Sequence, residues 1–136
     1  NRIVLEPATR DYMNRCLDVD LMLDTYPYPG GGTTLDALYM GVPVVTRYGE
    51  RRGTRFGLSI LQNIGLGELA ADSLQGYVEC AVQLAGDWGL LDLLHRQLRS
   101  LMKNAQGLDP ESYVRHLEQQ YKKIWKTYQE QKNDET

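Results

Sequence analysis

A run of three glycines followed by two threonines, at residues 30–34, is the part of this sequence best suited to binding a phosphate group. Glycine has no Cβ, so backbone N–H groups at this turn can approach a ligand closely. The apolar positions that follow have helical spacing, and the start of a helix carries unpaired N–H groups and a partial positive charge. Thr33 and Thr34 add hydroxyl donors, and Asp36 can accept hydrogen bonds from a ribose. These residues predict a diphosphate-binding turn without a lysine and without a bound metal.

The same residues also have a purely structural interpretation. The glycines can form a tight turn, Thr33 can cap the helix, and Asp36 can complete a capping box at the third helical position. Most such turns only connect elements, so the local sequence alone favours this interpretation. Two other nucleotide motifs are excluded. Leu35 stands where the dinucleotide fingerprint requires its third glycine, and no lysine precedes the threonines as in a P-loop.

Four arginines gather in the polar segment of residues 47–55, within an otherwise acidic chain. Such a cluster can attract a donor phosphate or an acceptor, or it can belong to a solvated loop balanced in part by Glu50. We prefer the solvated loop for Arg51 and Arg52. Arg55 lies next to a predicted helix start and is the candidate for contacting the ligand.

Other polar residues are not expected to take part in catalysis or in metal binding. Asp18 and Asp20 resemble a D-x-D pair that binds a metal–diphosphate, but they lie at the start of a predicted strand, at the edge opposite the expected ligand edge. His95 and His116 lie in predicted late helices, away from that ligand edge. We therefore expect no metal site, and no catalytic residue is assigned.

Short apolar runs alternate with segments of helical spacing, and this order must position the candidate residues. Strands are predicted at residues 2–6, 20–24 and 42–46, residues 68–70 can form a short fourth strand, and helices are predicted at about 9–17, 33–40, 55–63 and from 74 onward. The pattern predicts an α/β fold, a Rossmann-like parallel sheet flanked by helices, with a helical C-terminal layer packed on it. Ligands bind beyond the carboxyl ends of parallel strands. The segments 6–10, 24–34 and 47–55 should therefore lie along one edge.

The last predicted helix starts with Asp109 as N-cap and Pro110 at the first helical position. Its apolar residues are expected to face the core and the helix is expected to fray after Tyr128. The core-facing set is Tyr113, Leu117, Tyr121, Ile124 and Trp125. One nucleotide-sugar-binding domain is therefore predicted over residues 1–131, followed by a polar tail over 132–136.

The composition restricts the class of protein. With 136 residues, 42% of them hydrophobic and 24% charged, the chain suits one soluble domain with its own core. A net charge of −3 argues against a nucleic-acid binder, and no apolar run approaches the ~18 residues of a membrane span. Cys16 and Cys80 have no metal-binding neighbours, so reduced thiols in a cytoplasmic protein are expected. A start at Asn1, directly before an apolar run, suggests a piece of a longer protein.

Several motifs follow one another in an order that is far more specific than any one of them. They are residues 20–28, the glycine run, residues 33–38 and 40–46, Arg55, residues 59–61, 64–66 and 68–69, Tyr77-Val78, Glu118, Tyr121 and Trp125. In this order they resemble the carboxyl-terminal half of the O-linked N-acetylglucosamine transferase/SPINDLY family. The resemblance covers nearly the whole chain.

The resemblance implies the second half of a GT-B glycosyltransferase, which holds most of the nucleotide of a UDP-N-acetylglucosamine donor. Such enzymes transfer the sugar to Ser/Thr hydroxyls with inversion, without a metal and with no cofactor besides the donor. The implied partners are the nucleotide-sugar, a protein acceptor, the N-terminal half of the cleft and tetratricopeptide repeats. Because half the cleft is missing, we expect the isolated chain to be inactive.

The resemblance also assigns roles by position. It implies that Thr33 and its neighbouring backbone meet the diphosphate, that Asp36 meets the ribose and that the backbone of Ala8 meets the base. Tyr12 takes the place of a base-stacking histidine, and Gly31-Gly32 should offer backbone contacts only, since many members carry a threonine or histidine there. The predicted nucleotide-sugar-binding set is Ala8, Tyr12, Gly30, Gly31, Gly32, Thr33, Thr34, Asp36 and Arg55.

Two alternatives stay open at this point. The same fold can use another donor, such as GDP-fucose as in the SPINDLY branch. A non-catalytic domain can also keep the fold in order to bind a partner.

Overall fold

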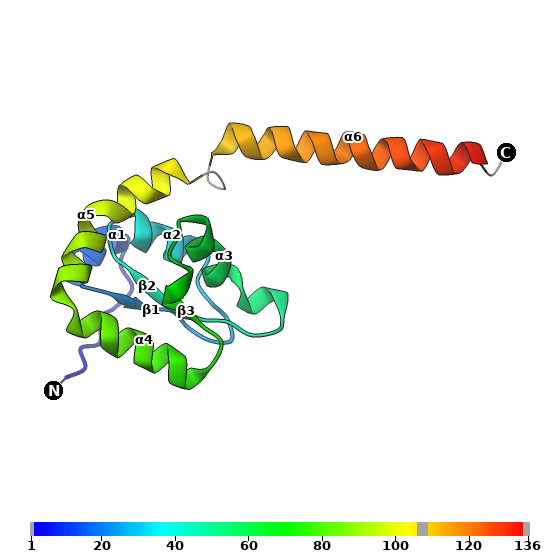
Figure 1. The fold of residues 1–136 in the computed structure, drawn as a ribbon. Helices are drawn as coiled ribbons and strands as arrows, with labels where there is room; N and C mark the ends of the chain where they lie inside the picture. The colour runs from blue at the N-terminus through cyan, green and yellow to red at the C-terminus, as the bar shows by residue number, and fades with distance from the viewer. Residues whose placement is uncertain (1, 106–108, 135–136) are drawn as a thin grey trace. The chain divides into compact units, whose positions relative to one another are not determined.

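A three-stranded parallel sheet in the order β1-β2-β3 organises the first part of the chain (Figure 1). Its strands are β1 (Met22–Leu23), β2 (Val44–Arg47) and β3 (Ala70–Ala71). Met22 pairs with Val44, and Thr46 pairs with Ala70. Val44, Val45 and Thr46 of the central strand are fully buried. A continuous apolar run such as residues 42–46 suits a strand that is covered on both faces.

The computed structural model describes residues 2–105 and 109–134. These residues fall into two compact units, 1–102 and 103–136, each described by itself below. The helices are α1 (Tyr12–Arg15), α2 (Gly32–Tyr39), α3 (Phe56–Asn63), α4 (Leu74–Gly86), α5 (Trp88–Asn104) and α6 (Pro110–Asp134). Short 3-10 turns are η1 (Cys16–Asp18), η2 (Arg52–Thr54) and η3 (Gly67–Leu69).

Helices cover both faces of the sheet. Figure 1 shows α2 and α3 on one face and α4 on the other. Right-handed crossovers explain this arrangement, because strands added in one direction place their connecting helices on the same face. The buried side chains of the helices follow helical spacing, for example Leu91, Leu94 and Leu98 in α5. The predicted α/β class and the parallel sheet are confirmed.

The prediction of a strand at residues 2–6 is wrong. These residues form neither helix nor strand, and Ile3, Val4 and Leu5 are exposed. A strand requires a neighbour for its backbone groups, and within the described residues β1 pairs only with β2. The apolar composition of residues 2–6 is typical of a strand, but it does not show whether a neighbouring strand is available for pairing. Leu23, expected to be buried, is also exposed on β1.

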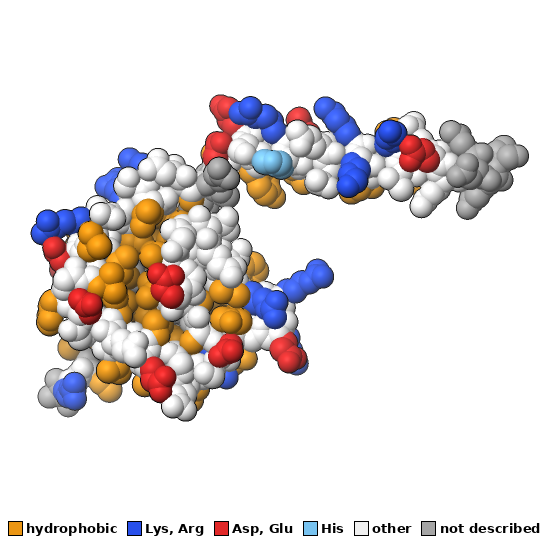
Figure 2. Space-filling model, in the orientation of Figure 1, with side chains coloured by type: hydrophobic (Ala, Val, Ile, Leu, Met, Phe, Trp, Pro, Cys, Tyr) orange, Lys and Arg blue, Asp and Glu red, His pale blue; other side chains and the backbone are white. Residues whose placement is uncertain are grey.

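The prediction for the start of the last helix is correct. The Asp109 carboxylate accepts a hydrogen bond from the Glu111 N–H, and Pro110 is the first helical residue. The five side chains expected to face the core are exposed, from 37% for Leu117 to 64% for Ile124, and Figure 2 shows hydrophobic side chains on the surface of α6. Among the described residues of unit 103–136, α6 has no second element to pack on, and the packing of these side chains on the sheet unit stays a prediction.

The helix also continues to Asp134 instead of fraying after Tyr128. Pairs one turn apart, such as Glu111–Arg115, support it along its surface. The single domain predicted over residues 1–131 stays a prediction, and residues 135–136 of the predicted tail lie outside the described residues. In the described part of the chain, every helix is too short or too polar to span a bilayer.

Gly41 directly follows the predicted helix end at about residue 40 and provides a test of this fold. Its φ of +92° lies in the left-handed region, and a Cβ there would come within 2.9 Å of the His95 carbonyl oxygen on α5. We expect Gly41→Ala to lower the free energy of unfolding by about 1–2 kcal/mol in urea denaturation. Gly53→Ala is the control, because a Cβ there would meet no described atom within 4 Å. Equal unfolding midpoints for Gly41→Ala and Gly53→Ala would contradict a requirement for glycine at position 41.

Candidate functional site

The Asp24 carboxylate anchors the loop that contains the glycine turn (residues 30–32). Asp24 follows β1 and is only 5% exposed. Its Oδ1 accepts hydrogen bonds from the N–H groups of Gly30, at 2.7 Å, and Thr25, at 2.9 Å. Its Oδ2 accepts a hydrogen bond from the Thr46 hydroxyl on β2, at 2.7 Å. One buried carboxylate therefore fixes the glycine turn to the carboxyl ends of two strands.

Thr34 holds the same turn from the other side. It is 0% exposed, and its hydroxyl donates to the Gly30 carbonyl oxygen at 2.9 Å. A Cβ at Gly30 would collide with the hydroxyl oxygens of Thr33 and Thr34, so only glycine fits there. Thr34 was expected to donate its hydroxyl to a ligand. The structure gives it a different role, since that hydroxyl is buried and already bonded.

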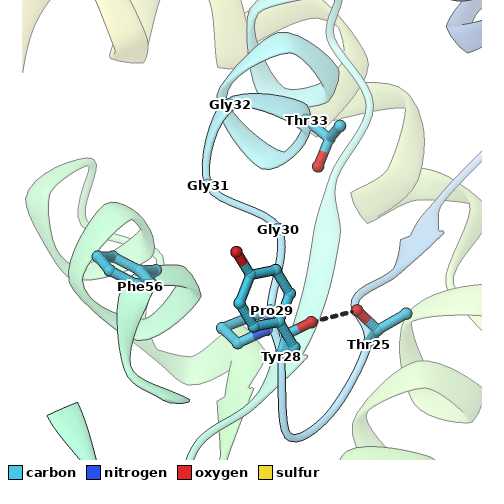
Figure 3. Close-up of a pocket in the computed structure, with 8 residues that line it drawn as sticks. All are labelled: Thr25, Tyr28, Pro29, Gly30, Gly31, Gly32, Thr33 and Phe56. Atoms are coloured by element: carbon cyan, nitrogen blue, oxygen red, sulfur yellow. Dashed lines mark hydrogen bonds between the residues drawn. The ribbon is translucent and has the colours of Figure 1, made fainter. Parts of the chain in front are cut away.

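In contrast to Gly30, the glycines at positions 31 and 32 face open space. A Cβ at either position would meet no described atom within 4 Å. Together with Thr33 they border a cavity of about 600 Å³ (Figure 3). Its lining residues are Thr25, Tyr28, Pro29, Gly30, Gly31, Gly32, Thr33 and Phe56. The backbone at the start of α2 is thus accessible to a ligand.

The capping interpretation of Thr33 and Asp36 is wrong. The helix starts at Gly32 with Gly31 as its N-cap, so Thr33 is already the second helical residue and Asp36 the fifth. The Leu35 N–H donates to the Gly31 carbonyl oxygen at 3.1 Å. The N–H groups of Gly32, Thr33 and Thr34 come before this first helical bond, as expected at a helix start. A helix that is capped by glycine leaves this end free for an anion.

Asp36 is bonded to Tyr12, its partner in the predicted set. The Tyr12 hydroxyl on α1 donates to Asp36 Oδ2 at 2.6 Å. This hydrogen bond and the negative charge of Asp36 raise the pKa of Tyr12 above its usual value. The structure therefore brings together the residues predicted for the ribose and the base. Ala8 lies in the exposed irregular segment before α1, and its contact with a base stays a prediction.

Arg55 shapes the loop between β2 and α3. Its Nε donates to the Gly49 carbonyl oxygen at 2.7 Å, while the Gly49 N–H donates to the Thr54 hydroxyl oxygen at 3.0 Å. Arg55 is outside the lining of the cavity beside the glycine turn, which includes its neighbour Phe56. Its contact with a nucleotide therefore stays a prediction. Arg47 stacks on the Tyr26 ring, with the guanidinium 4.1 Å from the ring centroid.

Sequence reasoning missed three residues of this site. Asp24 ends an apolar run directly before a glycine-rich loop, and that position was a usable signal for a buried anchor. Tyr77 donates its hydroxyl to the Asp24 carbonyl oxygen at 2.9 Å across 53 residues. Phe56 lines the cavity from the start of α3. Tyr77 was noted only as part of the ordered motifs and Phe56 not at all, because only the fold brings them to the site.

Replacing Asp24 tests its role as the anchor. Asp24→Asn puts an amide donor in place of one acceptor oxygen, so at least one buried donor loses its partner. We expect the free energy of unfolding to fall by about 1.5–3 kcal/mol in urea denaturation. Asp72→Asn is the matched control at an exposed position and should stay within about 0.5 kcal/mol of wild type. A similar loss of unfolding free energy in Asp24→Asn and Asp72→Asn would show that Asp24 does not anchor the loop.

Tyr77 gives a pH test of the same network. Burial and the Asp24 charge raise the pKa of its phenol in the folded state. The neutral phenol thus stabilises the fold fully below the unfolded pKa of about 10, and this contribution is lost as the pH rises through the folded pKa. Between pH 8 and 11, we expect the free energy of unfolding to fall more steeply in wild type than in Tyr77→Phe. Parallel pH profiles would show that Tyr77 does not titrate with the fold.

Comparison with known proteins identifies the family. The family model described as "Glycosyl transferase family 41" matches residues 1–117. A Hordeum vulgare protein named "Probable UDP-N-acetylglucosamine--peptide N-acetylglucosaminyltransferase SPINDLY" is 42% identical over 118 residues, which are 87% of this chain and 12% of that protein. The Arabidopsis thaliana protein with the same description and the name SEC is 34% identical over 116 residues, 85% of this chain and 12% of its own length.

A solved structure agrees with this result. A mutant of the Thermobaculum terrenum O-GlcNAc transferase superposes with a TM-score of 0.80 at 38% identity, over 89% of this chain and 24% of that one. The chain thus spans about an eighth of the length of the curated relatives it matches. The predicted resemblance is confirmed: the chain belongs to glycosyl transferase family 41.

Proposed function

We propose that this chain is the nucleotide-sugar-binding part of an inverting glycosyltransferase. The whole enzyme transfers N-acetylglucosamine from UDP-N-acetylglucosamine to serine and threonine hydroxyls of proteins. One observation carries the proposal: the accessible backbone of Gly31, Gly32 and Thr33 at the start of α2, beside a cavity of about 600 Å³. The names of the relatives, which describe UDP-N-acetylglucosamine–peptide N-acetylglucosaminyltransferases, support the donor and the acceptor class.

In this proposal the diphosphate of the donor binds at the start of α2. Sugar transfer leaves negative charge on the diphosphate, and unpaired N–H groups at a helix start stabilise such charge without reorganisation. Thr33 adds a hydroxyl donor from the second position of the helix. The proposed enzyme therefore needs no metal to stabilise the leaving group.

The ribose of the donor binds at Asp36. One oxygen of this carboxylate accepts a hydrogen bond from the Tyr12 hydroxyl, and the carboxylate has further lone pairs that can accept a hydrogen bond from a ribose hydroxyl. The hydrogen bond from Tyr12 also fixes the orientation of the Asp36 side chain. Tyr12 lies beside the ribose and offers its ring to the base.

The rest of the enzyme supplies what this chain lacks in the proposal. A second Rossmann-like half closes the cleft and brings the acceptor, tetratricopeptide repeats precede it, and the whole protein acts in the cytoplasm. The 136 residues alone are inactive, since they carry one side of the cleft. The small share of each relative that the chain covers is consistent with this division.

Nucleotide titration tests the proposed donor site. The chain is titrated with UDP and with GDP, while the amide resonances of the protein are followed by NMR. We expect UDP to shift the amides of Gly31, Gly32, Thr33 and Asp36 and to bind more tightly than GDP. Preference for GDP would assign a different donor, such as GDP-fucose, and no response to either nucleotide at millimolar concentration would oppose the donor site.

Asp36→Asn separates a ribose contact from a structural role. The hydrogen bond of a ribose hydroxyl to a charged group should be lost, so we expect UDP binding to weaken by about tenfold with little change in stability. Asp72→Asn, at an exposed position, should leave UDP binding unchanged. Unchanged binding together with a stability loss of ~1 kcal/mol would instead limit Asp36 to a structural role as acceptor of the Tyr12 hydrogen bond.

A further inference from the structure

A second cavity lies beside the loop that connects β2 to α3. It has a volume of about 440 Å³ and is lined by Tyr26, Pro27, Gly49, Glu50, Arg51 and Thr54. It shares no lining residue with the cavity beside the glycine turn, although the segment of residues 25–29 borders both. This segment follows β1 and the loop follows β2, so both cavities lie at the carboxyl ends of the strands, where ligands bind in parallel α/β folds.

The loop beside this cavity carries positive charge that the chain does not neutralise. Residues 47–55 contain four arginines and one glutamate, and Arg51 lines the cavity. Among residues 2–105 and 109–134, none of the four forms an ion pair, although Glu50 is close in sequence. Arginines elsewhere do pair with carboxylates, namely Arg15, Arg96 and Arg115. The balancing contact with Glu50 that the solvated-loop interpretation assumed is therefore not seen among the described residues.

Arg47 is the half-buried member of this group. Its guanidinium stacks on the ring of Tyr26, at 4.1 Å from the ring centroid, and Tyr26 lines the cavity. The Nε of Arg47 is buried and has no hydrogen-bond partner in the described part of the chain. Buried donors in folded proteins are almost always bonded, so an unbonded one requires an explanation. Arg47 thus places a second positive charge beside the cavity without an anionic partner.

The backbone of the loop is fixed by its own hydrogen bonds. The buried Thr54 hydroxyl accepts from the Gly49 N–H at 3.0 Å and donates to the Arg51 carbonyl oxygen at 2.7 Å. The Arg55 Nε donates to the Gly49 carbonyl oxygen at 2.7 Å. A Cβ at Gly49 would come within 2.9 Å of the Tyr26 hydroxyl oxygen, so glycine lets the ring close over the loop. A binding loop that is already ordered loses less entropy when a ligand binds.

The diphosphate of the donor does not account for these charges. In the proposed function it binds at Gly31, Gly32 and Thr33, and none of these residues lines the second cavity. A nucleotide-sugar has no anionic group besides its diphosphate. The protein acceptor is the remaining substrate, and it has to reach the donor along the same edge of the sheet. Acidic side chains of the acceptor can supply the negative charge.

We propose that the cavity beside Arg51 binds an acidic side chain of the protein acceptor, close in sequence to the hydroxyl that receives the sugar. This inference rests on the proposed function, because that function makes a protein the second substrate. A guanidinium presents its N–H groups in a fork that matches the two oxygens of a carboxylate. The unpaired arginines also attract acidic segments before contact, over about 8 Å at physiological salt.

Peptide binding tests the charge of the occupant. One labelled peptide has a central serine between glutamates, and a second has glutamines in their place. Fluorescence anisotropy gives the dissociation constant of each for the 136-residue chain, with and without UDP. We expect the glutamate peptide to bind roughly tenfold more tightly at low salt, to lose this advantage as salt is added, and to shift the amide resonances of residues 49–54. Equal affinities for the two peptides overturn the proposal.

Two variants locate the contact. Arg51→Gln removes the charge that lines the cavity, and Arg47→Gln removes the charge stacked on Tyr26. We expect each to weaken binding of the glutamate peptide by roughly two- to fivefold and to leave binding of the glutamine peptide and of UDP unchanged. Arg51 is exposed, so Arg51→Gln should fold normally, and it decides the case alone if Arg47→Gln does not fold.

Arg96→Gln is the matched control. It removes the same charge from an exposed position on α5, where Arg96 pairs with Asp92. This variant should bind both peptides as wild type does. If Arg96→Gln weakens the glutamate peptide as much as Arg51→Gln does, the attraction is one of overall charge, and the assignment of the cavity fails.

Titration with UDP alone separates this inference from the proposed function. Amide shifts at Gly31, Gly32 and Thr33 support the donor site and leave the loop to the acceptor. Shifts centred on residues 49–54 instead would place the diphosphate at the arginines and overturn the acceptor assignment. Peptide binding without UDP binding overturns the proposed function and the acceptor role together. UDP binding without a preference for the glutamate peptide overturns the acceptor role only.

Discussion

The buried carboxylate of Asp24 is the interaction on which the site depends. Burying a charge costs several kcal/mol unless hydrogen bonds replace its hydration. Here three donors surround it, from Gly30, Thr25 and Thr46. They belong to the glycine turn, to the end of β1 and to β2. The hydration that Asp24 loses is therefore replaced only when sheet and turn are both assembled, and this couples the binding loop to the core.

The same carboxylate also explains how α3 reaches the site. A Cβ at Gly57 would collide with the Thr46 hydroxyl and lie 2.9 Å from Asp24 Oδ2. Glycine at this position lets α3 approach the Asp24 network closely, and its neighbour Phe56 then borders the cavity. Gly30 and Gly57 thus pack against the anchor, whereas Gly31 and Gly32 face open space. Glycine is therefore needed at Gly30 and Gly57 because a side chain would not fit, whereas at Gly31 and Gly32 it leaves the backbone accessible.

The sequence predicted those structural features, such as helix ends, that depend on interactions within one helical turn. Gly41 and Pro110 mark helix ends because φ angles and missing N–H groups act within one turn, and both lie where predicted. The strand predicted at residues 2–6 failed for the opposite reason, since strand pairing requires a partner element. In the site, the sequence predicted an accessible backbone turn, which the structure shows, while the nucleotide contacts of Tyr12 and Asp36 stay predictions. The sequence suggested that the Thr34 hydroxyl donates to a ligand, whereas in the structure this hydroxyl is buried and donates to the Gly30 carbonyl oxygen. Sequence alone does not distinguish the two roles, because it does not show whether the hydroxyl is buried.

The hydrogen bond between Tyr12 and Asp36 makes the N-terminal segment sensitive to the occupant of the site. Within residues 2–18 no side chain is buried, so few contacts besides this bond hold α1 against α2. A ligand that takes only the free oxygen of Asp36 leaves the bond intact, and its binding energy does not depend on the order of α1. A ligand that displaces the Tyr12 hydroxyl from Asp36 Oδ2 breaks this bond and thereby loosens α1. By reciprocity, any contact that fixes α1 then weakens such a ligand by the same factor. Whether an occupant of Asp36 keeps or displaces the Tyr12 hydroxyl therefore sets whether that occupant and the N-terminal segment act independently or in opposition.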